Sequence, residues 1–333
     1  MTPAIASLPV SYQDVADAAD RIRALIVETP LLEVTELSEA IGGRIFVKCE
    51  NLQRTGSFKL RGGMNALSSL TAEERAKGVV AYSSGNHAQG VAAAARHFGV
   101  PATIIMPEDA PAIKKANTKA LGADVVTYDR YSESREELGQ RFQERTGAAL
   151  IPPYDYLPTM LGQGTSAIEV TNKLRARGLS LDTAVICCGG GGLAGGSALV
   201  FNTTFPQACV WAAEPDTHDD TQRSLQAGQR VSNDPQARSI CDAIVTPTPG
   251  AITFPVLQAC GVEGRSASDD NVLESVAFAA NRLKLIVEPG GAIALAVARK
   301  HLEELRGQTV VVYLSGGNID PDMLAHALAA AST

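Results

Sequence analysis

The chain has 333 residues, of which 45% are hydrophobic and 20% are charged, the balance of a soluble globular protein long enough for two domains. The formal net charge is −7 and no basic run occurs, so neither nucleic acid nor an acidic membrane surface is an expected partner. The apolar stretches are short, and the first ten residues lack a basic region and a long apolar core, so we expect neither a membrane span nor a secretory signal.

The cysteines and histidines do not form a recognisable metal motif. Six cysteines occur without a CxxC pair, and five histidines occur without an HExxH motif, which argues against a zinc site. In a chain of this length the cysteines are typical of reduced, mostly buried residues. We therefore expect a cytoplasmic protein.

Lys59 is the first residue along the chain that suggests chemistry. It stands among small residues, in the segment Ser57-Phe58-Lys59-Leu60-Arg61-Gly62-Gly63. Most lysines are solvated surface charges, so this residue alone indicates nothing. Its interpretation depends on the loops that follow.

The next part of the chain alternates short apolar strands with helices. The pattern predicts strands at residues 79–82, 102–106 and 124–127, and helices at 86–98 and 113–121. This βαβαβ order predicts a parallel sheet with helices on both faces, and so an α/β fold.

The same alternation resumes in the second half of the chain. We expect further strands at 149–151, 183–188, 209–213 and 309–314, and helices at 165–176, 193–201 and 292–305. In open parallel sheets, ligands bind beyond the carboxyl ends of the strands. Three polar or glycine-rich loops follow such ends, after Tyr82, Cys188 and Leu314.

The loop Ser83-Ser84-Gly85-Asn86-His87 begins the helix 86–98. Ser and Asn are ordinary N-cap residues, but a cap needs only one of them. Two hydroxyls, an amide and free backbone N–H groups at a helix N-terminus would also hold a carboxylate.

Four consecutive glycines, Gly189, Gly190, Gly191 and Gly192, lie between a buried strand and a helix. Glycines let backbone N–H groups approach an anion, and the helix N-terminus adds partial positive charge, so we interpret this loop as a phosphate site. Gly190, Gly192 and Gly195 also satisfy the GxGxxG pattern of dinucleotide-binding proteins, with Glu214 about twenty residues on. That alternative leaves Lys59 and the Ser83 loop unexplained.

Glu214, Asp219 and Asp220 form an acidic group after a predicted strand. It is either a solvated turn or a site of oxygen ligands for Mg²⁺ or Ca²⁺.

Taken together, these segments resemble the fold type II family of pyridoxal-phosphate enzymes, in particular the serine/threonine dehydratases (ammonia-lyases) and the related serine racemase. The motifs that carry the resemblance occur in the family's order over roughly residues 28 to 320: Glu50-Asn51-Leu52-Gln53-Arg54-Thr55-Gly56-Ser57-Phe58-Lys59-Leu60-Arg61-Gly62, Ser83-Ser84-Gly85-Asn86-His87-Ala88-Gln89-Gly90, Gly162-Gln163-Gly164-Thr165, the four glycines, Glu288-Pro289-Gly290-Gly291-Ala292 and Ser315-Gly316-Gly317-Asn318. The resemblance implies two α/β domains with the cofactor between them. Residues 1–67 and 152–333 would form the large domain, and residues 68–151 a small domain that closes over substrate.

The resemblance also implies a role for each site residue. Lys59 would hold pyridoxal 5′-phosphate as a Schiff base and later act as a base, and Ser84 is the candidate acid or base on the opposite face. The residues that would contact the cofactor are Phe58, Asn86, the four glycines, Glu288 and Ser315. Those that would contact the substrate are Ser83, Ser84, His87 and Arg135. A divalent cation, Mg²⁺, Ca²⁺ or Mn²⁺, would bind Glu214, Asp220 and the carbonyl of His218.

The implied activity is β-elimination of a 3-hydroxy amino acid of the threonine or serine type, which gives a 2-oxo acid and ammonia. The alternatives are a racemase acting on serine or hydroxyaspartate, and a 3-hydroxyaspartate dehydratase. A homodimer is the family expectation. Two segments leave the substrate open: 152–156 looks dehydratase-like, whereas 241–255 is unlike typical threonine dehydratases and should pass near the cofactor ring.

Overall fold

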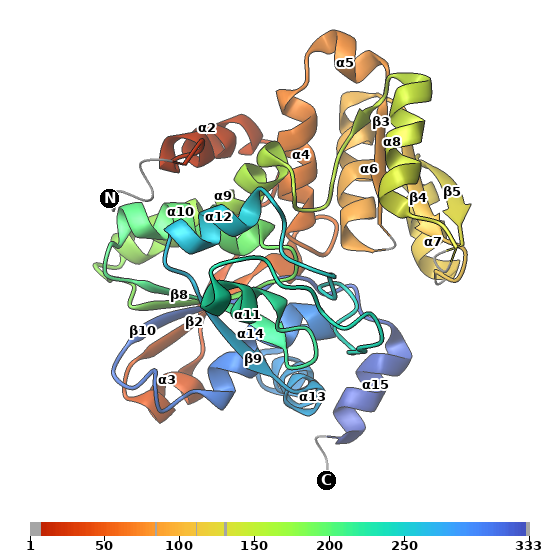
Figure 1. Ribbon diagram of the computed structural model, residues 1–333. Helices are drawn as coiled ribbons and strands as arrows, with labels where there is room; N and C mark the ends of the chain where they lie inside the picture. The colour runs from red at the N-terminus through yellow and green to blue at the C-terminus, as the bar shows by residue number, and fades with distance from the viewer. Residues whose placement is uncertain (1–7, 84, 111, 130–131, 331–333) are drawn as a thin grey trace.

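The computed structural model describes residues 8–83, 85–110, 112–129 and 132–330, which form two β-sheets with helices packed on them (Figure 1). The α/β fold with parallel sheets predicted from the sequence is confirmed. Over these ranges, no helix combines the length and the apolar character needed to span a membrane.

The larger sheet has six strands in the order β1-β2-β10-β7-β8-β9. All neighbouring strands are parallel except β1 and β2, which are antiparallel. The central strands are almost entirely buried and apolar, as expected when helices cover both faces of a parallel sheet. The strands comprise β1 (Leu31–Glu33), β2 (Arg44–Cys49), β10 (Thr309–Leu314), β7 (Thr183–Cys187), β8 (Cys209–Pro215) and β9 (Glu263–Ala267).

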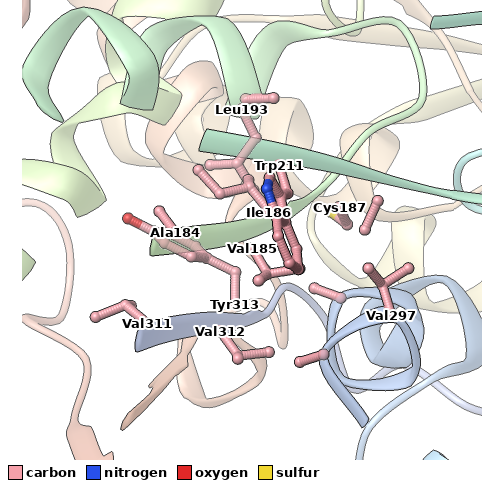
Figure 2. Packing of buried hydrophobic residues seen from close by; sticks show 14 of the residues in the cluster. Ala184, Val185, Ile186, Cys187, Leu193, Trp211, Val297, Val311, Val312 and Tyr313 are labelled. Atoms are coloured by element: carbon pink, nitrogen blue, oxygen red, sulfur yellow. The ribbon is translucent and has the colours of Figure 1, made fainter. Parts of the chain in front are cut away.

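Helices form a layer on each face of this sheet. Helices α10 (Gly192–Thr204) and α14 (Pro289–Lys300) both contact β7 and β8. Figure 2 shows the core between them, with Leu193 on the α10 side of the strands and Val297 on the α14 side. The remaining helices of this part are α2 (Tyr12–Ile22), α3 (Thr35–Ile41), α9 (Leu157–Ala176), α11 (Asp220–Ala227), α12 (Thr253–Ala259), α13 (Asp269–Phe278), α15 (Pro321–Ala330), the 3₁₀ turn η1 (Glu50–Leu52) and the π-helical turn η2 (Ala279–Leu283).

The smaller sheet has four parallel strands in the order β5-β4-β3-β6. It contains the predicted βαβαβ unit, in the upper right of Figure 1. Its strands are β3 (Val79–Tyr82), β4 (Ala102–Pro107), β5 (Asp124–Tyr128) and β6 (Ala149–Leu150). The helices beside it are α4 (Lys59–Ser69), α5 (Ala72–Ala76), α6 (Asn86–Phe98), α7 (Ala112–Ala120) and α8 (Arg135–Thr146).

Helix α9 differs most from its predicted start, since it begins at Leu157 instead of at residue 165. Gly162 and Gly164, which look like loop residues in the sequence, lie inside this helix. A Cβ at Gly162 would come within 2.5 Å of the carbonyl oxygen of Arg61, and one at Gly164 within 2.6 Å of that of Gly196. These glycines therefore allow neighbouring helices to approach α9 closely.

Candidate active site

Lys59 is the first residue of α4 and lies next to the end of β10. The chain just before it is held by backbone contacts: Ser57 forms an isolated bridge with Gly316, and the N–H of Phe58 donates to the carbonyl of Ser315 at 3.1 Å. The Lys59 loop and the Ser315 loop, more than 250 residues apart in sequence, are therefore fixed to each other.

Two residues beyond Lys59, a buried cluster of charges anchors the first turn of α4. The fully buried guanidinium of Arg61 donates to both oxygens of Glu50 at 2.8 Å and to both oxygens of Glu169, at 2.6 and 2.9 Å. Lys48 also donates to Glu169. Such a cluster is stable only while every charge has its partners, so it joins α4 to β2 and α9 in one arrangement.

The Lys59 amine is enclosed and has a backbone carbonyl as hydrogen-bond acceptor. Its Nζ donates to the carbonyl of Pro153 at 2.8 Å and lies 5.1 Å from the centre of the Phe58 ring. Burial lowers the pKa of Lys59 to about 8, although Cys187 and Glu288 oppose the shift. A lysine with this pKa has a substantial neutral fraction near neutral pH, which nucleophilic and base chemistry requires.

The four glycines have the geometry of an anion cradle at the N-terminus of α10. Gly191, with φ +88°, is the N-cap, and Gly192 is the first residue of this 13-residue helix. A Cβ at Gly190 would overlap the Tyr154 ring, and one at Gly192 would overlap Gln163 Oε1. Side chains are therefore excluded from the loop, and its N–H groups remain available to a phosphate. This fits the expected pyridoxal phosphate.

Residues 154 and 155 support this loop, a role that sequence reasoning did not assign to them. Tyr154 lies over Gly190, and both oxygens of Asp155 accept hydrogen bonds from the backbone N–H groups of Ala251 and Ile252. Thr253 donates to the carbonyl of Gly190 at 2.5 Å. Tyr and Asp in a loop are common, so only the tertiary contacts reveal this role.

The N-terminus of α6 faces the same cavity as Lys59. Ser83, Gly85, Asn86 and His87 all line this cavity, as do the four glycines. The Ser83 hydroxyl accepts from the N–H of Gly85 at 3.2 Å. Ser84, the predicted second acid or base, lies outside the described residues.

The ring of His87 is neutral, and its hydrogen bond defines the tautomer. Nε2 lies 2.8 Å from the carbonyl oxygen of Ile151, so Nε2 carries the hydrogen. Burial, with help from the Lys59 charge, lowers the pKa of His87 to about 3. Nδ1 is buried and has no hydrogen-bond partner among the described residues. This nitrogen presents a lone pair, which suits a hydroxyl or amine donor of a ligand better than a carboxylate.

Glu288 and Asn86 form a polar chain along the cavity wall. Asn86 Nδ2 donates to Glu288 Oε1, and Asn318 Nδ2 donates to Asn86 Oδ1 at 2.7 Å. Glu288 also lies against the backbone of Gly316, where a Cβ would overlap its Oε1. Burial raises the pKa of Glu288 to about 7, against the hydrogen bond from Asn86 and the charges of Lys114 and Lys59.

Ser315 is buried at the end of β10, beside the cavity. A hydrogen bond links it to Cys187, which lines the cavity directly. Burial raises the pKa of the Cys187 thiol to about 11, although the hydrogen bond with Ser315 and the Lys59 charge oppose the shift. Cys187 therefore remains a neutral thiol next to the predicted partner of the pyridine nitrogen.

The cavity is also lined by charged side chains from α8, α7 and the loop around residue 242. Arg135, at the start of α8, lines it, with its Nε 2.8 Å from Glu136 and its guanidinium 5.5 Å from the centre of the Tyr82 ring. Lys114 of α7 and Asp242 line it too, and neither was predicted from the sequence. Single charged residues on a helix and in a loop give no signal before the fold brings them together.

The predicted metal ligands lie apart from this cavity. The carboxylate of Glu214 accepts hydrogen bonds from the N–H groups of Thr221 and Gln222 in α11. Asp220 Oδ1 accepts a hydrogen bond from the Asn233 side chain at 2.6 Å. Burial raises the pKa of both carboxyls, that of Asp220 to about 7, and Asp220 Oδ2 is buried without a partner among the described residues. No cluster of three or more His, Cys, Asp or Glu side chains in the described part of the chain could hold a metal.

The comparisons with known proteins agree with this geometry. Residues 22–316 match the family described as "Pyridoxal-phosphate dependent enzyme". The chain is 43% identical to an L-threo-3-hydroxyaspartate ammonia-lyase of a Pseudomonas species, covering 96% of this chain and 98% of that protein. It is 39% identical to a serine racemase of Schizosaccharomyces pombe, covering 96% and 97% of the two chains.

Solved structures give the same result. The crystal structure of serine racemase from Dictyostelium discoideum superposes with a TM-score of 0.85 at 35% identity, covering 93% of this chain and 99% of that one. The crystal structure of a threonine deaminase from T.th. superposes with a TM-score of 0.87 at 39% identity, also covering 93% and 99%. The glycine cradle, the enclosed lysine and these matches lead to one conclusion: the chain belongs to the family of pyridoxal-phosphate-dependent enzymes.

Proposed function

We propose that this protein is a pyridoxal-phosphate-dependent ammonia-lyase that acts on 3-hydroxyaspartate. Water leaves the substrate by β-elimination, and hydrolysis then gives a 2-oxo acid and ammonia. The supporting observation is the charge of the cavity, because Arg135 lines the same cavity as Lys59. A guanidinium there suits a second carboxylate, which threonine and serine lack. Relatives at 43% and 42% identity are L-threo-3-hydroxyaspartate ammonia-lyases.

The cofactor would be held by residues that the sequence already suggested. Lys59 would bind it covalently, the glycine loop with the α10 N-terminus its phosphate, and Phe58 and Asn86 the ring. Ser315 would face the pyridine nitrogen, and Glu288 would contact the ring through Asn86. When bound, the cofactor supplies an electron sink for the charge that develops at the substrate α-carbon.

Lys59 is the proposed base. Its pKa of about 8 leaves part of the amine neutral near neutral pH, and the carbonyl of Pro153 orients Nζ. Ser83 and the N–H groups at the start of α6 would hold the α-carboxylate, while Nδ1 of His87 accepts from a hydroxyl or amine of the substrate. Ser84 is the proposed acid or base opposite Lys59.

A substrate panel tests the proposal. The holoenzyme is incubated with L- and D-threonine, L- and D-serine and the 3-hydroxyaspartate stereoisomers, with and without Mg²⁺, and both 2-oxo acid release and enantiomer interconversion are measured. We expect the fastest oxo-acid release from one 3-hydroxyaspartate stereoisomer. Lys59→Ala should lose both this activity and the visible absorbance of the lysine-bound cofactor, whereas Lys115→Met should retain both.

Three results would contradict parts of the proposal. Oxo-acid release from threonine or serine alone would contradict the proposed substrate but support the proposed reaction. Conversion of L- to D-serine without oxo acid would favour the racemase alternative. A Lys59→Ala variant that stays active and yellow would refute the whole assignment.

We further propose a divalent cation near Glu214, Asp220 and the carbonyl of His218. The supporting observation is a pair of buried carboxyls, those of Glu214 and Asp220, whose pKa values are raised, and one oxygen of Asp220 has no partner among the described residues. Carboxylate oxygens are ligands that Mg²⁺ and Ca²⁺ prefer. The substrate panel tests this site, because oxo-acid release is measured with and without Mg²⁺.

We also propose that residues 68–151 form a small mobile domain whose closure excludes water from the cavity. The chain would act as a homodimer. Exposed Leu52 and Ile286 support this, because the side chain of Asn51, the neighbour of Leu52, donates to the carbonyl of Ile286. All six cysteines are free, which agrees with a reducing, cytoplasmic location.

A further inference from the structure

An ion pair joins the two parts of the molecule across the cavity. Lys114 belongs to α7 beside the four-stranded sheet, and Asp242 belongs to the loop that packs on Gly189 and Gly290 beside the six-stranded sheet. Lys114 Nζ lies 2.8 Å from Asp242 Oδ2. Both side chains line the same cavity as Lys59 and Arg135.

The two partners are held very differently. The Lys114 side chain is 16% exposed, whereas that of Asp242 is 59% exposed. Burial disfavours the Lys114 charge, but Asp242 outweighs this effect and the pKa of Lys114 is raised. The ammonium is therefore fixed in the cavity wall and remains charged, while its carboxylate partner is largely in solvent.

An ion pair with an exposed partner contributes little to stability, because solvent screens the attraction. A carboxylate that enters the cavity offers Lys114 the same chemistry as Asp242 does, without the solvent screening. The exchange of the Asp242 carboxylate for a ligand carboxylate at Lys114 therefore has a small cost in free energy. When a ligand has one carboxylate, the start of α6 already binds that group. Such a ligand has no second carboxylate for Lys114, so the Lys114–Asp242 ion pair stays intact.

We infer that Lys114 is a specificity-determining residue, which binds the β-carboxylate of a dicarboxylic substrate by exchanging Asp242 for it. This inference rests on the proposed function and deepens it. Lys114 and Arg135 together form the site for the second carboxylate, and Asp242 occupies the lysine in its absence. Asp242 thus competes with the substrate.

Competition predicts opposite effects for the two partners. Lys114→Met removes a charged hydrogen bond, so KM for L-threo-3-hydroxyaspartate should rise about ten- to a hundredfold, with less than about a twofold change for L-serine or L-threonine. Asp242→Asn frees the lysine, so KM for 3-hydroxyaspartate should fall. Lys115→Met is the matched control, because Lys115 lies on the same helix but donates to the carbonyl of Glu108, away from the cavity.

A binding experiment separates this inference from the proposed function. Succinate and butyrate, which differ by one carboxylate, are titrated into the holoenzyme by calorimetry. Succinate should bind more tightly than butyrate to the wild type, the preference should be lost in Lys114→Met, and it should grow in Asp242→Asn. This result would support the inference even if 3-hydroxyaspartate is not turned over.

Several results would overturn the inference. One is a wild type that does not prefer succinate. Another is an unchanged preference in Lys114→Met. If both variants raise KM for all substrates alike, the pair only holds the two parts of the molecule together. Circular dichroism of each variant verifies that it is folded.

Discussion

Glu288 is a carboxyl group of the cavity wall whose protonation should depend on the fold. It is buried, with Asn86 as its donor, and its pKa is raised to about 7 by burial. In the unfolded chain the same group titrates near 4.5. Between these values the folded protein binds a proton that the unfolded chain does not, so stability decreases as pH rises through this window.

Glu288→Gln should remove this pH dependence while Gln still accepts the hydrogen bond of Asn86. Urea unfolding of the cofactor-free wild type and the variant is measured from pH 5 to 7.5. The free energy of unfolding of the wild type should fall relative to that of the variant, with a slope approaching about 1.4 kcal/mol per pH unit, the value for one proton. Parallel curves for the two proteins would show that Glu288 is ionised throughout.

Single residues were predictable where a local sequence pattern encodes the chemistry. Lys59 stands among small residues, and the glycine loop and the Ser83 loop stand at the ends of predicted elements. The structure brings all three to one cavity. Lys114 and Asp242 are 128 residues apart and have no such pattern. Their pairing depends on how the two sheets face each other.

At the scale of elements, helices α4 and α6 meet through glycines. A Cβ at Gly63 would come within 2.7 Å of the carbonyl oxygen of Gly90, and one at Gly90 within 2.8 Å of that of Lys59. These are backbone atoms, so a side chain at either position must move a helix. The contact therefore determines where the first turn of α4, and with it Lys59, lies.

Gly90→Ala should destabilise the protein by about 1–3 kcal/mol and weaken the absorbance of the lysine-bound cofactor, because the added methyl group pushes Lys59 away from α6. Gly195→Ala is the matched control: it also lies within a helix, but its Cβ would have no contact closer than 3.5 Å. Alanine has the higher helix propensity, so the control should be neutral or up to about 1 kcal/mol more stable. The two variants are compared by urea unfolding and by the absorbance of the bound cofactor. Equal effects of the two substitutions would contradict the proposed role of the contact between α4 and α6.

Elements bounded by Gly or Pro were predicted well, and elements defined by packing were not. Strand β3 and helix α6 have the predicted bounds, because Gly78, Gly85 and Gly99 delimit them. Helix α9 begins eight residues earlier than predicted, since Gly162 and Gly164 serve contacts between helices. The antiparallel edge strand β1 is three residues long and has no pattern of its own.

At the scale of the whole molecule, the face defined by the exposed apolar residues Val27, Leu52 and Ile286 comes from segments joined by side-chain hydrogen bonds, and none of the three residues lines the cavity. Leu52 and Ile286 are each 46% exposed, and Val27, 37% exposed, adjoins them through the Gln53 side chain, which bonds its backbone N–H and carbonyl. Contiguous apolar residues on a surface mark interaction sites more often than isolated ones do. This face is the proposed contact between two copies of the chain.

Sedimentation of the wild type should therefore give twice the chain mass of 34.8 kDa. Ile286→Glu places a charge in the contact and should shift the protein to the mass of one chain. Val126→Glu is the control, since Val126 is equally exposed but lies on β5 at the edge of the other sheet. A wild type that sediments as a single chain, or a dimer lost only in the control, would exclude this face.

The enclosed amine of Lys59 has a consequence for the handling of this protein. Aldehydes and acylating reagents react only with neutral amines. At pH 7.4, a pKa near 8 leaves about one Lys59 side chain in five neutral, compared with about one in a thousand for an ordinary lysine. In the cofactor-free protein, Lys59, the proposed anchor of the cofactor, is thus open to chemical damage. Pyridoxal phosphate bound to Lys59 would act as a protecting group for the amine, so the purified enzyme should keep its activity best when stored with the cofactor.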